Sequence, residues 1–227
     1  MSDPSPDTQD TPLEATHTAE INSSRRKLTG AVLGGSAIFT LASRPVLAGV
    51  CQTPSAAVSG NLSQHGTPAV CRGLSPGYWK EHPNQWPKPT YDPGTATRPS
   101  GSAGNGFRNQ TENWSGGTLF HPTFAGTLFK ADLDQNVTTA KTSLSMMQVM
   151  QMNNGNNPWG LTDPDNLGAH IVAALLNAKK TYTSGVLSEM QVITMWNEWV
   201  SKGYFEPTAG VHWTSAQIVI YIQSTFA

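Results

Sequence analysis

Apolar positions repeat every three to four residues in four segments of the C-terminal half of the chain, the spacing that places side chains on one face of a helix. The predicted helices are residues 144–152, 164–180, 189–202 and 215–226. Short polar connections join them. The pattern therefore predicts a mainly α fold with a four-helix bundle at its C-terminal end.

Residues that favour helix N-termini precede these segments. Two predicted starts have the capping-box spacing, a hydroxyl residue followed three positions later by glutamine: Ser188 with Gln191, and Thr214 with Gln217. Asp163 is a capping acid followed by Pro164, a residue well suited to a first helical turn. Ser143 or Thr142 is available as the cap of the first helix. Each predicted helix thus has a start signal of its own.

Residues 49–132 have a different pattern. They are dense in Pro, Gly, Ser, Thr and Asn and have no sustained helical or alternating period. Yet they contain many aromatic residues, too many for a disordered linker: Tyr78, Trp79, Trp86, Tyr91, Phe107, Trp114, Phe120, Phe124 and Phe129. We therefore predict an irregular, loop-rich aromatic coat that packs on a helical body formed by residues 133–227.

Residues 1–48 are organised like an export signal. Arg25 and Arg26 follow a polar leader and precede a weakly hydrophobic, glycine-containing stretch. Val46 and Ala48 then match a signal-peptidase site, so we predict a twin-arginine signal peptide that is cleaved after Ala48. A membrane anchor is the alternative, but the apolar run is shorter than the roughly 20 residues that a spanning helix needs.

Cleavage would leave residues 49–227, a length that fits a single domain. We expect this domain to reach the periplasm or the cell exterior in the folded state, without a stable membrane anchor. Its expected partners during export are the twin-arginine translocase and a signal peptidase. The chain has 14 Lys and Arg against 15 Asp and Glu, a formal net charge of −1. Since no basic patch is present, nucleic acid is not an expected partner.

The two cysteines, Cys51 and Cys71, both lie beyond the predicted leader. An oxidising compartment favours their pairing. The disulfide would close a loop of about 20 residues and stabilise the fold by roughly 3 kcal/mol. The alternative is a nucleophilic thiol at Cys71, but no base lies near it in the sequence.

Two segments resemble known proteins. Residues 71–83 read Cys-Arg-Gly-Leu-Ser-Pro-Gly-Tyr-Trp-Lys-Glu-His-Pro, and residues 171–178 read Ile-Val-Ala-Ala-Leu-Leu-Asn-Ala. The first resembles a motif found near the start of many exported bacterial proteins of no established activity, and the second resembles the helix that often accompanies it. The resemblance implies a secreted module that spans most of residues 49–227, and it implies no catalytic role.

The first of these segments contains the candidate ligand-binding residues. Tyr78, Trp79, His82 and Trp86 combine large rings with a polar tip, and such rings can stack on a sugar. The alternative is that Trp79 and Trp86 pack against the helices and anchor the coat. Both interpretations stay open at the level of sequence.

The histidines beyond the leader form no local metal motif: they are His65, His82, His121, His170 and His212. Because no cofactor fingerprint is present either, we expect neither a bound metal nor a cofactor. A composite site is the alternative, and it would combine His82, His121 and His212 with Glu81 or Glu198. The methionines of residues 146–152 suit Cu(I), although methionines on a short helix more often fill a core.

Two functional hypotheses follow. The first is a non-catalytic exported module, structural or ligand-binding, with a surface polymer or a second copy of itself as partner. The second is a periplasmic or secreted hydrolase, or a metal-dependent enzyme, that uses His82 and His121. We favour the first, because no catalytic motif occurs in the sequence.

Overall fold

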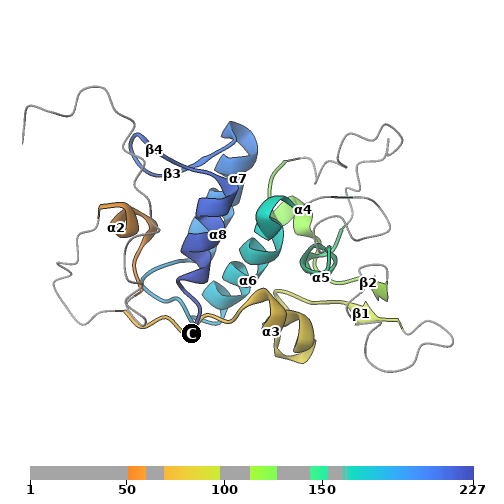
Figure 1. Ribbon diagram of the computed structural model, residues 1–227. Coiled ribbons are helices and arrows are strands. Elements are labelled where there is room, and N and C mark those ends of the chain that lie inside the picture. The colour runs from red at the N-terminus through yellow and green to blue at the C-terminus, as the bar shows by residue number, and fades with distance from the viewer. Residues whose placement is uncertain (1–50, 60–68, 98–112, 127–143, 153–160, 162) are drawn as a thin grey trace, which may run out of the picture. The chain divides into compact units, whose positions relative to one another are not determined.

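The computed structural model of the chain describes residues 51–59, 69–97, 113–126, 144–152, 161 and 163–227. The predicted leader, with Arg25, Arg26 and the cleavage position after Ala48, lies outside the described residues. Residues Val46–Ala227 form one compact unit. Within the described part the fold is mainly α, as the hydrophobic pattern predicts (Figure 1).

The described α-helices are α2 (Pro54–Ser59), α3 (Pro76–Glu81), α4 (Phe120–Thr123), α5 (Met146–Met150), α6 (Leu167–Lys179), α7 (Glu189–Lys202) and α8 (Ser215–Gln223). Two short 3₁₀ turns, η2 (Pro83–Gln85) and η5 (Pro164–Asn166), precede Trp86 and α6. Two antiparallel strand pairs complete the described elements: β1 (Thr95–Ala96) with β2 (Trp114–Ser115), and β3 (Phe205–Thr208) with β4 (Val211–Trp213).

Helix α6 forms the centre of the fold. It contacts α3, α5, α7 and α8, and Figure 1 shows it between α8 on one side and α5 on the other. Its residues from Leu167 to Asn177 are all buried except His170. A helix that is apolar around most of its circumference needs neighbours on every side. The composition of α6 therefore explains why the other helices gather around it.

The predicted capping boxes of α7 and α8 are confirmed. Ser188 and Gln191 exchange side-chain and backbone hydrogen bonds at the start of α7, and Thr214 and Gln217 do the same at α8. Helix α5 also begins with a capping box, but its cap is Ser145, not the predicted Ser143 or Thr142. The helix starts later than its apolar stripe suggests because Ser145, unlike the earlier residues, has a glutamine three positions on.

The start of α6 differs from the prediction. The turn η5 stands between Asp163 and the helix, and Asp165 and Asn166 both have φ of 56°. The carboxylate of Asp163 nevertheless caps the helix, because it accepts hydrogen bonds from the backbone N–H groups of Gly168 at 2.7 Å and Ala169 at 3.1 Å. Asp163 is only 2% exposed. Burial raises its pKa to about 7, and the two N–H groups oppose this shift without cancelling it.

The connection between α7 and α8 is the largest departure from a plain bundle. The prediction placed a short polar link there, whereas the structure has the β3–β4 hairpin. Gly203 ends α7 with φ of 81°, and Gly210 in the hairpin turn has φ of 76°, a region that glycine enters at little cost. Phe205 and Trp213 face each other with ring centroids 5.9 Å apart. The hairpin thus adds two aromatic side chains to the core.

Candidate functional site

Residues 71–83, the first of the two motifs, include α3 and the segment before it. Ser75 caps α3 by accepting a hydrogen bond from the backbone N–H of Tyr78, and Pro76 occupies the first helical turn. No helix was predicted within residues 49–132, but here the Ser75 cap and Pro76 start one. This helix places Tyr78 and His82 one turn apart on one face.

Tyr78 and His82 form a stacked pair on α3. Their ring centroids are 4.1 Å apart and the planes are inclined by 12°. Nδ1 of His82 lies 2.9 Å from the carbonyl oxygen of Tyr78, so Nδ1 carries the proton that this bond needs. Both side chains are half-buried. Nε2 of His82 has no hydrogen-bond partner among the described residues, so this nitrogen, beside an aromatic ring, is not engaged within that part of the protein.

Trp79 and Trp86, in contrast, lie inside the fold. Trp79 is fully buried and Trp86 is 3% exposed. The indole N–H of Trp86 donates to the carbonyl oxygen of Trp79 at 3.0 Å, and that of Trp79 donates to Oδ1 of Asn177 at 3.2 Å. Of the four candidate ligand-binding residues, the structure therefore leaves Tyr78 and His82 accessible and uses the two tryptophans for packing.

Asn177 joins the two segments on which the family resemblance rests. Its Oδ1 accepts a hydrogen bond from the backbone N–H of Leu74 at 2.9 Å, and its Nδ2 donates to the carbonyl oxygen of Leu74 at 2.9 Å. With the bond from Trp79, three groups of the first segment are satisfied by one fully buried side chain of α6. We call Leu74, Trp79 and Asn177 the motif junction. Asn177 was not among the predicted site residues, although a lone amide in an apolar helix is a signal that could have pointed to it.

Gly73 lies beside the motif junction and contacts the segment after α8. Its N–H donates to the carbonyl oxygen of Thr225 at 3.1 Å, and it forms a parallel bridge with Phe226. A Cβ atom at Gly73 would lie 2.6 Å from the Thr225 oxygen and 3.1 Å from Nδ2 of Asn177. The glycine is therefore needed for close approach between backbones.

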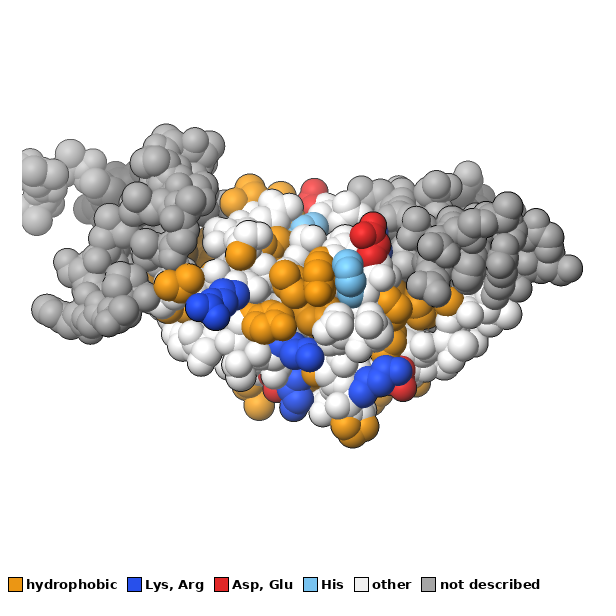
Figure 2. All heavy atoms as spheres, turned by 90° about the horizontal axis from the view of Figure 1, so that it is seen from below, with side chains coloured by type: hydrophobic (Ala, Val, Ile, Leu, Met, Phe, Trp, Pro, Cys, Tyr) orange, Lys and Arg blue, Asp and Glu red, His pale blue; other side chains and the backbone are white. Residues whose placement is uncertain are grey.

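The face that carries α3 is mixed in character. Figure 2 views the molecule from below Figure 1, the side on which α3 lies, and shows hydrophobic side chains next to histidine, with Lys and Arg side chains around them. Lys80 belongs to α3, and its partial burial lowers its pKa from the usual value. Hydrophobic, histidine and cationic side chains thus occur close together on this side of the molecule.

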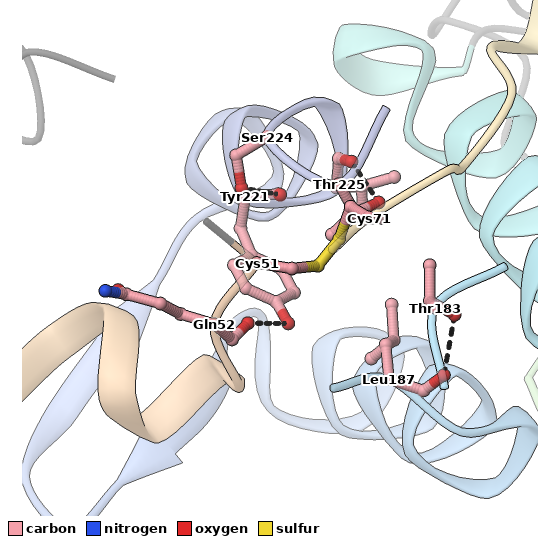
Figure 3. Close-up of a disulfide and its surroundings, with 9 residues drawn as sticks. Cys51, Gln52, Cys71, Thr183, Leu187, Tyr221, Ser224 and Thr225 are labelled. Atoms are coloured by element: carbon pink, nitrogen blue, oxygen red, sulfur yellow. Dashed lines mark hydrogen bonds between the residues drawn. A yellow bond between two sulfur atoms is a disulfide. The ribbon is translucent and has the colours of Figure 1, made fainter. Parts of the chain in front are cut away.

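The predicted disulfide between Cys51 and Cys71 is confirmed. It lies between α8 and the connection that leads into α7, as Figure 3 shows. The two cysteines are 2% and 8% exposed. Beside the disulfide, the hydroxyl of Tyr221 donates to the carbonyl oxygen of Gln52 at 3.0 Å, and that of Thr183 donates to the carbonyl oxygen of Leu187 at 2.8 Å. The bond is therefore part of the core.

The histidines of the alternative enzyme hypothesis have separate surroundings. His121 hydrogen-bonds through Nδ1 to the carbonyl oxygen of Phe124, while its buried Nε2 has no hydrogen-bond partner within the described part of the chain. His212 stacks on Tyr204, with centroids 3.8 Å apart. Among the described residues, which include Glu81 and Glu198, no three His, Cys, Asp or Glu side chains are grouped closely enough to hold a metal ion. The methionines of residues 146–152 are all buried in the core.

A cavity of about 420 Å³ lies apart from these residues, at the connection between α6 and α7. Its lining includes Ser184, Ser188 and Glu189. The carboxylate of Glu189 accepts a hydrogen bond from the hydroxyl of Tyr91 at 2.7 Å and pairs with Lys179 at 3.5 Å. The acid in this cavity is thus already engaged by groups of the protein, and none of the predicted ligand-binding residues lines the cavity.

No family model, curated protein or solved structure matches the chain. The described helices include none with the length and apolar character required to cross a bilayer.

Proposed function

We propose that the chain is an exported, extracytoplasmic module that is non-catalytic and serves a structural or ligand-binding role. The observation that carries the proposal is the motif junction. The most specific residues of the first motif, Trp79 above all, are bonded within the fold to Asn177 of the second. A motif whose residues bond to one another within the fold has a structural role. The accessible residues beside it then supply the binding surface.

The proposed architecture of the exported module follows the sequence analysis. Residues 133–227 provide a helical body of four main helices, and residues 49–132 provide the irregular aromatic coat. The burial of Trp79, Trp86 and Phe120 supports this division, because large aromatic anchors can replace regular secondary structure in a loop-rich segment.

Export through the twin-arginine route is the second part of the proposal. Residues 1–48 would act as the signal peptide, and the mature protein would begin at Gly49 in the periplasm or outside the cell. The disulfide between Cys51 and Cys71 supports this location, since such bonds persist in oxidising compartments. The translocase and the signal peptidase are the proposed partners during export.

The export proposal predicts that replacing both Arg25 and Arg26 by lysine abolishes export of the full chain. The translocase recognises the arginine pair, so the variant should remain inside the cell as an uncleaved precursor with reduced cysteines. Cell fractionation, mass spectrometry and non-reducing electrophoresis would measure this. Replacing Arg72 and Arg98 by lysine is the matched control and should leave export unchanged. Equal export of the leader variant and the wild type would contradict the route.

The proposed ligand surface is the stacked pair of Tyr78 and His82. A cell-surface polysaccharide is the proposed partner, because a sugar offers an apolar face for the tyrosine ring and hydroxyl groups for Nε2 of His82. Self-association of the module is the second candidate partner. Trp79 and Trp86, which were also candidates from sequence, would act indirectly by holding α3 in place.

Tyr78→Ala is expected to weaken co-sedimentation of the purified protein with isolated cell-surface polysaccharide about tenfold, since the loss of one stacking ring at a binding site commonly has this size. The matched control is Tyr204→Ala, because Tyr204 is also half-buried and also stacks on a histidine. It should bind within twofold of the wild type. If both variants bind equally well, the stacked pair on α3 is not the ligand surface.

A further inference from the structure

Residues 51–59, which we call the N-terminal strap, are attached to the rest of the described protein by the disulfide, a few hydrogen bonds and the partly buried side chains of Ala57 and Val58, which pack against the core. Within the strap only Cys51 and Pro54 are buried. The hydroxyl of Tyr221 donates to the carbonyl oxygen of Gln52, and the N–H of Cys51 donates to the carbonyl oxygen of Ala69 at 3.1 Å. Helix α2, the rest of the strap, contacts β3. A helix of this length has little stability of its own.

The segment on the other side of the disulfide is held firmly without it. The N–H of Arg72 donates to the carbonyl oxygen of Tyr182 at 3.1 Å, and Gly73 bonds to Thr225. Leu74 then forms two hydrogen bonds with Asn177. These bonds, together with the burial of Trp79, fix the chain after Cys71 to α6 and to the segment after α8.

We infer that the disulfide between Cys51 and Cys71 is a latch: it fastens the N-terminal strap to a body that folds without it. The inference rests on a difference between the two segments that the disulfide joins: the segment after Cys71 is hydrogen-bonded to the body at several points, whereas the strap is not. Breaking the bond leaves Cys71 in place, because its neighbours are bonded to the body. It leaves the strap with one backbone hydrogen bond, one bond from the Tyr221 hydroxyl and the partly buried Ala57 and Val58 of a short helix, too little to order nine residues against their conformational entropy.

Closure of the latch is a thiol–disulfide exchange. The thiolate of Cys71 attacks one sulfur of an incoming disulfide, which leaves a mixed disulfide and releases one thiol. The thiolate of Cys51 then displaces the second sulfur of the donor, and the Cys51–Cys71 bond forms. In total the two cysteines lose two protons and two electrons, and the donor disulfide becomes two thiols. Because both sulfurs are buried once the strap has docked, reduction requires the strap to open first.

The order of events during export follows if the proposed function holds. Cytosolic thiols are kept reduced, so a protein that folds before export must fold without this bond. The body can do so, because the motif junction does not depend on the strap. The strap begins at the third residue after the predicted cleavage position. Because cytosolic thiols stay reduced, the latch would close only after the module has reached an oxidising compartment.

Hydrogen exchange of the full chain tests the latch. Amides of residues 51–59 should exchange about a hundredfold faster in the reduced protein and in Cys51→Ser than in the oxidised protein. Amides of α6, α8 and residues 71–86 should keep their protection. Loss of protection in α6 on reduction would overturn the inference, since the body would then depend on the bond. Unchanged exchange of the strap would also overturn it, since the strap would then be held without the bond.

Two further variants distinguish the effect of the disulfide on the strap from the effect of the neighbouring hydrogen bond. Cys71→Ser should reproduce the exchange pattern of Cys51→Ser, because both remove the same bond. Tyr221→Phe removes the hydrogen bond to Gln52 and keeps the disulfide, so the strap should remain protected to within about threefold. These measurements use purified protein. Their outcome is therefore independent of whether the chain is exported, and failure of the export proposal would be seen only in the fractionation of the Arg25 and Arg26 variant.

Discussion

Replacement of Asn177 by alanine is expected to lower the free energy of unfolding by about 3–5 kcal/mol. The substitution removes both acceptor bonds and the donor bond of the motif junction at once. The N–H and carbonyl of Leu74 and the indole N–H of Trp79 would lose their partners in an environment with little access to water, since Trp79 and Asn177 are fully buried. Each unsatisfied buried group costs about 1–3 kcal/mol. Denaturant unfolding followed by tryptophan fluorescence measures the change.

Two other asparagines provide matched controls for this substitution. Asn84 is exposed, and its replacement by alanine should change stability by less than about 0.5 kcal/mol. Oδ1 of Asn197 accepts one hydrogen bond from the N–H of Ala125 at 2.8 Å in a half-buried position, so its replacement should cost about 1 kcal/mol. If Asn177→Ala costs no more than Asn197→Ala, the motif junction does not have the importance that we assign to it.

The stability of the protein is expected to fall as the pH rises from about 4 to about 7, through the contribution of Asp163. Burial raises the pKa of this carboxyl from 3.8 to about 7. Between these values the folded protein holds a proton that the unfolded chain has released. The unfolded state is therefore favoured by rising pH in this window, by on the order of 3 kcal/mol in total. Chemical unfolding at a series of pH values measures the slope.

Asp163→Asn isolates this contribution, because an amide does not titrate. The variant should show a flatter dependence on pH, and the difference between the two curves should grow between pH 4 and pH 7. Partial burial lowers the pKa of His170, and Lys80 adds to this effect. Protonation of His170 therefore disfavours the folded state, so this residue contributes stability that is lost as the pH falls through the histidine pKa range. That contribution is common to both proteins and cancels in the difference. Asp165→Asn, at an exposed position, should keep most of the wild-type slope, because the charge of Asp165 is the smallest of the contributions to the pKa of Asp163. Parallel curves for wild type and Asp163→Asn would contradict the raised pKa.

Local signals in the sequence were sufficient to predict the main helices. The apolar period of α6, α7 and α8 and the capping boxes at Ser188 and Thr214 depend on residues within one or two turns. Sequence reasoning is reliable for such features because the physical cause and its effect lie close together in the chain. The disulfide was predictable for another reason, since only two cysteines exist and a single pairing is available.

The motif junction could not be derived in this way. Leu74 and Asn177 are 103 residues apart, and no local pattern of either segment points to the other. Helix α3 was missed because its Pro-Gly pair is also typical of a turn. The same proline suits a first helical turn when Ser75 caps the helix, and the sequence alone does not distinguish the two. The turn η5 was missed for a similar reason. It depends on two residues with positive φ and on the reach of the Asp163 side chain into the first turn of α6.

The wide separation of the partners at the motif junction has a consequence for protein synthesis. Trp79 emerges from the ribosome long before Asn177, and Gly73 emerges long before Thr225. The indole rings of the first motif therefore lack their packing partners while the chain is still being synthesised. A nascent chain that stalls before α6 would keep large aromatic surfaces exposed to chaperones and proteases. The native state can therefore form only after α8 has been synthesised. A machinery that exports only folded proteins would thus reject incomplete chains.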